Sequence, residues 1–139
     1  MSDTTHPAPH HQRPHPAPMA GPFLEFDLDR EIQQLHQEDT WSTGRNSKTL
    51  VKYADFRVVL MALKAGRRIE EHRAEGRISF QTIAGHVSMR ASGRTFDLPA
   101  GRLLALDCAA VHDVEALEDS AVLLTIAWPE ETEDRQAGR

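Results

Sequence analysis

From residue 48 onward the sequence is a succession of short segments with β-strand character, and this feature points to an all-β fold. The segments are rich in Val, Ile, Leu, Thr and Phe, and turn signals such as Ser92-Gly93 separate them. The predicted strands are Thr49–Tyr53, Phe56–Lys64, Ile78–Ile83, His86–Ala91, Arg94–Leu98, Leu103–Leu106, Val111–Leu117 and Ala121–Trp128. Many short strands at this spacing indicate a sandwich or barrel, and a double-sheet jelly roll fits their number.

One short helix is expected ahead of the strands. Within Asp27–Gln37, the residues Leu28, Ile32 and Leu35 recur at helical spacing, and Asp27 can cap the start. The sequence before this helix is rich in Pro and His and holds little to bury. We therefore expect one domain in four parts: a disordered tail over 1–22, a helix and lead-in over 23–47, a β-barrel over 48–129, and a frayed acidic tail over 130–139.

Charge and cysteine content exclude several classes of protein. The formal net charge is -5, and acidic and basic residues are interspersed through the body, whereas nucleic-acid binding needs a clustered basic patch. No apolar run approaches the roughly 20 residues of a membrane span, and the N-terminus lacks the profile of a secretory signal. The single cysteine, Cys108, precludes an internal disulfide. We expect a cytoplasmic protein that binds neither nucleic acid nor membrane.

Two patches of glycine and histidine have a specific spacing within the β-rich part of the sequence. In the first, Gly66 is followed by five residues and then His72, and Gly85 closes the patch. In the second, Gly101 ends a Pro-Ala-Gly turn, and His112 follows after ten residues. Either patch alone says little, because glycines between strands are common.

Together the patches resemble the two motifs of the cupin family. The first motif is glycine, five residues, His-x-His, three or four residues, glutamate, six residues, glycine. Here Gly66, His72 and Gly85 match, while Ala74 fills the slot of the second histidine and Ile78 that of the glutamate. In the second motif Gly101 and His112 match, and the slots of its proline, second glycine and asparagine hold Asp107, Ala109 and Ala116. The chain is similar to small single-domain bacterial cupins, which implies a cupin-type double-stranded β-helix (jelly-roll barrel) and a homodimer.

The resemblance also implies what the site holds. Metal-bearing cupins coordinate a divalent transition metal with three histidines and one glutamate inside the barrel. Only His72 and His112 remain here, so the resemblance implies at most a weakly bound metal unless another residue completes the shell. Cys108 is a candidate third ligand, although a lone cysteine also packs as a small buried hydrophobe. His86 and Glu75 are weaker candidates. We expect His86 at the start of a strand outside the barrel mouth, and Glu75 to be a solvated loop carboxylate.

Strand alternation predicts which side chains face the interior. If Ile78 points inward, Phe80 and Thr82 do too, and Gln81 points away. With His72 and His112 these residues give a mostly apolar interior holding a few polar groups, as small-molecule pockets have. The alternative is that they are plain core residues and the barrel is filled.

Three functions follow from these features. The first is a small-molecule-binding barrel that is non-catalytic or weakly metal-dependent. The second is a metal-dependent enzyme of the dioxygenase or isomerase type with an incomplete histidine site, and the third is a sensor of metal or pH. The tail histidines His6, His10, His11 and His15 could bind metals loosely, or be solvated residues without a role.

Overall fold

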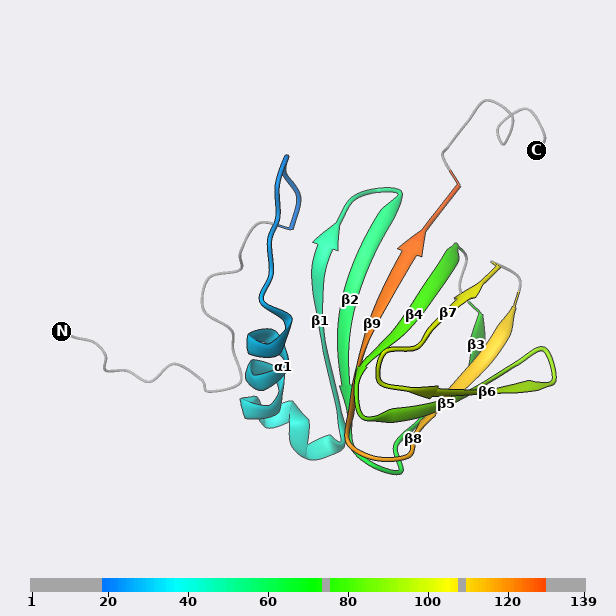
Figure 1. Cartoon of the computed structure of the whole chain (residues 1–139). Helices are drawn as coiled ribbons and strands as arrows, with labels where there is room; N and C mark the ends of the chain where they lie inside the picture. Colours follow the sequence, from blue (N-terminus) through cyan, green and yellow to red (C-terminus); the bar gives the residue numbers. More distant parts are fainter. Residues whose placement is uncertain (1–18, 74–75, 108–109, 130–139) are drawn as a thin grey trace.

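Two antiparallel sheets face each other in the structure (Figure 1), a computed structural model that describes residues 19–73, 76–107 and 110–129. The larger sheet has the strand order β1-β2-β9-β4-β7, and the smaller has the order β3-β8-β5-β6. The strands are β1 (Arg45–Lys52), β2 (Phe56–Leu63), β3 (Arg68–Arg73), β4 (Arg77–Ala84), β5 (His86–Ala91), β6 (Arg94–Pro99), β7 (Leu103–Leu106), β8 (Val111–Ala116) and β9 (Ser120–Ala127). The predicted all-β jelly roll is confirmed.

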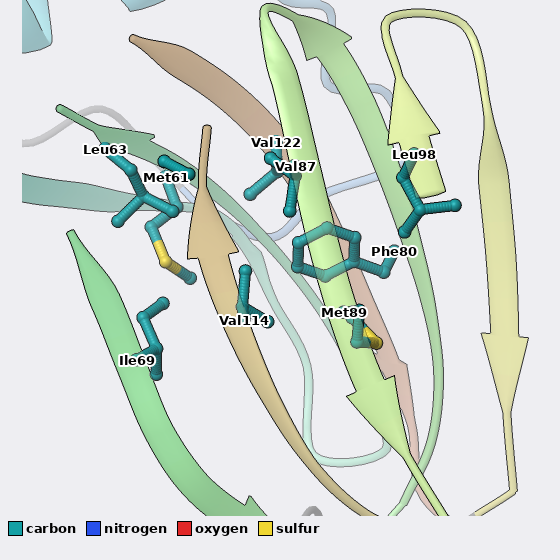
Figure 2. Close-up of a cluster of buried hydrophobic side chains, with 10 residues drawn as sticks. Met61, Leu63, Ile69, Phe80, Val87, Met89, Leu98, Val114 and Val122 are labelled. Atoms are coloured by element: carbon teal, nitrogen blue, oxygen red, sulfur yellow. The ribbon is translucent and has the colours of Figure 1, made fainter. Parts of the chain in front are cut away.

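The core lies between the two sheets. Alternate residues of each strand enter it, because successive side chains of a strand point to opposite faces. Its buried members are Met61, Leu63, Ile69, Phe80, Val87, Met89, Leu98, Val114, Ala116 and Val122. Figure 2 shows the Phe80 ring of β4 among Val87 and Met89 of β5 and Val122 of β9.

Helix α1 (Leu28–Gln37) covers the outer face of the larger sheet beside β1 and β2 (Figure 1). The side chain of Asp27 accepts a hydrogen bond from the backbone N–H of Arg30 and caps the helix start, as predicted. Leu35 is fully buried and packs with Leu50, Leu60 and Ala62 in a second apolar cluster. The helix is followed by a short 3-10 helix, η2 (Asp39–Thr43).

The structure departs from the sequence-based expectation at the sheet edges. Strand β1 begins at Arg45, within the 23–47 segment assigned to the helix and lead-in, and not at Thr49. Strand β3 was not predicted at all. Both are edge strands with many charged residues, so the alternation that marks a half-buried strand is weak there.

The chain also makes contacts before Phe23, where we expected the ordered body to begin. The carbonyl of Met19 accepts a hydrogen bond from the Lys52 backbone, and Gly21 exchanges hydrogen bonds with the Tyr53 hydroxyl. The predicted tails otherwise fall on residues 1–18 and 130–139, which lie outside the described residues. Within the described part, no helix has the length and apolar character of a membrane span.

The two ends of the barrel differ. At one end, which we call the closed end, the turns after β2, β4 and β8 are bonded together: Ala65 N–H donates to the Asp119 carboxylate, and His86 N–H donates to the Ser120 hydroxyl. The sheets converge there and diverge toward the other end (Figure 1). This other end, the mouth end, holds the β1–β2 turn, the end of β9 and the starts of β4 and β8.

Candidate functional site

The structure pairs the two motif histidines in neighbouring strands. His72 of β3 and His112 of β8 are direct partners in the antiparallel register, one residue from the Arg73–Val111 pair at the mouth end. His112 lies on the same face of β8 as the core residues Val114 and Ala116, and it is only 4% exposed. Its Nδ1 lies 3.3 Å from the carbonyl oxygen of Ala110, so the Nδ1-protonated tautomer donates a hydrogen bond there.

The backbone register therefore places His72 and His112 side by side on adjacent strands. The side chain of His72 lies outside the described residues, as does Cys108. Their predicted roles as metal ligands stay predictions.

Strand β4 carries the three other predicted pocket residues. Ile78, Phe80 and Thr82 are each at most 4% exposed, while the alternating Ser79 and Gln81 are half-buried. The alternation expected from the sequence is present. Phe80 belongs to the core cluster, so at its depth the interior is filled by side chains.

Ile78 lies at the mouth end in the slot of the family's glutamate. It is paired with two apolar residues, Ile126 of β9 and Leu106 of β7. A buried isoleucine offers no donor atom to a metal. Among the described side chains, no three of His, Cys, Asp or Glu lie together as a potential metal-ligand set. The described residues therefore do not fit the three-histidine, one-glutamate centre that the family pattern implies.

Thr82 lies deeper, paired with Val122, and is completely buried. Its backbone forms hydrogen bonds with Gly101 and Arg102, but its side-chain Oγ1 is buried without a hydrogen-bond partner. Such a hydroxyl is destabilising in a dry interior.

Of the weaker candidates, the structure describes His86, which lies away from the interior. His86 is the first residue of β5, at the closed end, and its Nε2 contacts the carboxylate of Asp97 on β6. Its neighbour Val87 faces the core, so His86 faces outward. Glu75 and the four tail histidines lie outside the described residues.

A cation that the sequence analysis did not single out faces the interior. Arg57 lies on the same face of β2 as Met61 and Leu63, whose side chains enter the core. Leu60 and Ala62 lie on the opposite face and pack in the cluster beneath α1. Arg57 pairs with Ile126 at the mouth end. Its Nε is buried and has no hydrogen-bond partner. The signal was available: in the apolar strand FRVVLMAL, a single charged residue stands at an inward position.

Trp128 holds this arginine. The Arg57 guanidinium carbon lies 5.1 Å from the centroid of the Trp128 ring. The Trp128 backbone N–H donates to the carbonyl of Asp55 in the β1–β2 turn, which keeps the ring beside β2. A cation over an indole face is attracted by the ring's electrons.

The interior face becomes accessible toward the mouth end. On β2, Leu63 is fully buried and Met61 nearly so, but Val59 and Arg57 are partly exposed. Strand β9 shows the same gradient, from buried Val122 to partly exposed Ile126. Solvent therefore reaches interior-facing positions of the larger sheet near Arg57.

Comparison with known proteins agrees with this architecture. No family model matches the sequence, and no curated protein is significantly similar to it. Among solved structures, an RmlC-like cupin protein from Desulfovibrio desulfuricans is 25% identical, with 62% of this chain and 84% of that chain covered and a TM-score of 0.57. KdgF from a Halomonas species is 21% identical, with 64% and 84% covered and a TM-score of 0.57.

A variant of salicylate 1,2-dioxygenase from Pseudoaminobacter salicylatoxidans is 17% identical, with 72% of this chain and 32% of that chain covered and a TM-score of 0.61. The structures similar to this chain thus include enzymes as well as proteins described only by their fold. The two facing antiparallel sheets and the agreement with these structures show that the chain has the jelly-roll fold of the small cupin proteins.

Proposed function

We propose that this barrel binds a small organic molecule at its mouth end and does so without a tightly held metal. The observation that carries the proposal is the burial gradient along β2 and β9, because it leaves interior-facing positions of these two strands buried at the closed end and partly exposed at the mouth end. Mostly apolar walls with a few polar groups are the usual make-up of a small-molecule site. Among the described residues, Arg57 and His112 are polar groups that face the interior at this end.

The identity of Ile78 argues against a metal-dependent reaction. A divalent metal in a protein needs three or more donor side chains in practice, and the slot of the carboxylate is apolar here. A metal held by two imidazoles alone exchanges readily with a chelator.

A metal-dependent cupin enzyme is the second candidate. The observation in its favour is the direct pairing of His72 with His112, because this register places two potential ligands on adjacent strands. Cys108 would be the first residue to consider as a third ligand.

A ligand screen tests the proposal. Thermal shifts of the purified chain are measured against a library of small polar and apolar organic molecules, with Val59→Trp and Leu103→Trp as paired variants. Val59 faces the interior at the mouth end, whereas Leu103 is 57% exposed on edge strand β7. The first variant therefore places a tryptophan inside the barrel and the second places one outside it. We expect ligands that stabilise wild type and Leu103→Trp and lose their effect on Val59→Trp. Hits that stabilise all three proteins equally would contradict a site in the barrel.

The homodimer that the resemblance implies stays a proposal. Light scattering on the purified chain distinguishes a dimer from a monomer, and each sheet has two edge strands through which a second copy could pair.

A further inference from the structure

We infer that the mouth end selects a small organic acid, whose carboxylate binds Arg57 and whose hydrocarbon body lies on the apolar wall beside it. The inference rests on the proposed binding function and adds the chemical class of the ligand. It is drawn from the placement of charge around Arg57.

The guanidinium is buried in part, and no anion among the described residues balances its charge. Its Nε has no hydrogen-bond partner, although a guanidinium is a donor that ordinarily finds an acceptor when buried. Within the described part of the chain, no carboxylate lies within ion-pair distance of Arg57. Its contact is with Trp128, and an aromatic face is a much weaker acceptor for an N–H group than a carboxylate is.

A second cation lies directly opposite. Lys52 of β1 pairs with Arg57 of β2 in the antiparallel register, so both side chains leave the sheet on the same face. A β-bulge between Thr49 and Val51 sets this register. Like charges in directly opposed positions repel each other, and among the described residues neither cation forms an ion pair with a carboxylate. An anion bound at this face would relieve the repulsion.

The neighbours of Arg57 select the kind of anion. Its partner in β9 is Ile126, which pairs in turn with buried Ile78, and Val59 follows on the same face of β2. An inorganic phosphate or sulfate would gain nothing from these side chains. A carboxylate with an alkyl or aryl body would bind the guanidinium through two parallel hydrogen bonds and bury its apolar part on them.

Trp128 preorganises Arg57 for ligand binding. The ring restrains the guanidinium, so less side-chain entropy is lost when a ligand binds. Arg57 thereby acts as the specificity-determining residue of the site.

The test uses hexanoate and its neutral isostere hexanamide. Trp41→Phe leaves Trp128 as the single tryptophan, and its fluorescence reports binding at the site. We expect hexanoate to bind at least tenfold more tightly than hexanamide, and binding to weaken from hexanoate through butyrate to acetate by up to about fourfold per methylene. In the same background, Arg57→Gln should weaken hexanoate binding by about 10- to 100-fold, because a charged hydrogen-bond donor is lost.

Arg94→Gln is the matched control. The Arg94 guanidinium also lies over an aromatic ring, 4.9 Å from the centroid of Phe96, but Arg94 is exposed at the start of edge strand β6. This variant should bind hexanoate like wild type. Lys52→Gln should weaken binding by a few fold only, because Lys52 is exposed.

Equal affinities for hexanoate and hexanamide, with the thermal shifts of both ligands abolished by Val59→Trp, would overturn the inference while leaving the proposed binding function in place. Unchanged hexanoate binding in Arg57→Gln, with a folded protein by circular dichroism, would overturn it as well. A failure of hexanoate to bind would also overturn it, and the library screen would then decide the binding function separately.

Discussion

Adding one methyl group at Gly85 should destabilise the barrel far more than adding it at Gly101. Both glycines have positive φ angles, +85° and +94°, a region that side chains with a β-carbon disfavour. At Gly85 a β-carbon would also lie 2.3 Å from the carbonyl oxygen of Asp119 and 2.7 Å from the Cα of Ser120. At Gly101 it would have no heavy atom within 4 Å.

The pair of variants therefore separates backbone strain from steric overlap. We expect Gly101→Ala to lower the free energy of unfolding by about 1–2 kcal/mol through φ strain alone. Gly85→Ala should lose a further ~1–3 kcal/mol, because the turn after β4 must move away from backbone atoms of the β8–β9 turn. That movement would also disturb the bond from His86 N–H to the Ser120 hydroxyl.

Urea unfolding followed by circular dichroism measures both values by linear extrapolation. The slope with denaturant should be the same for wild type and both variants, so that a change in midpoint reports stability. Equal midpoints for Gly85→Ala and Gly101→Ala would refute the close packing of the two turns at the closed end. A larger loss at Gly101 would refute the assignment of both turns.

Further predictions concern the interior, the helix and the tails. Thr82→Val should raise the free energy of unfolding by about 1 kcal/mol, because the buried Oγ1 has no partner; a lower midpoint would reveal a partner for that hydroxyl. Asn46→Ala should cost about 2 kcal/mol, because its side-chain amide donates 2.9 Å hydrogen bonds to the Leu35 carbonyl and to a glutamate; denaturant unfolding that matches wild type would show that these bonds do not anchor α1. A chain of residues 19–129 should melt like the full chain, and calorimetry showing a large fall would contradict the expected dispensability of the tails. Ala74→His combined with Ile78→Glu should raise zinc affinity by orders of magnitude in competition titrations, and unchanged affinity would show that the motif slots do not converge.

The strands of the sheet interiors could be predicted because their burial shows in the sequence. Residues Ile78, Phe80 and Thr82 alternate with half-buried neighbours, and the structure shows that alternation. Strand β3 escaped prediction because it is an edge strand in which Ile69 is the single apolar residue, so its sequence RIEEHR has no hydrophobic period.

The site could be predicted only in part. The spacing of the two motifs led to His72 and His112, and the register between β3 and β8 pairs them. Arg57 was missed because its strand reads as a continuous apolar segment, and which face is inward depends on where α1 packs. The pairing of Lys52 with Arg57 depends on a β-bulge, and no pattern in the sequence of β1 predicts that bulge.

Elemental analysis tests the central claim most directly, namely that this cupin barrel works as a binding module and not as a metal enzyme. The full chain is expressed without an affinity tag, purified without chelator, and measured by inductively coupled plasma mass spectrometry before and after dialysis against EDTA. With Ile78 in the carboxylate slot, we predict transition metals far below one equivalent per chain before dialysis and background levels after it. About one equivalent of a single transition metal that survives dialysis would contradict the account, because it would require a complete ligand set within the barrel.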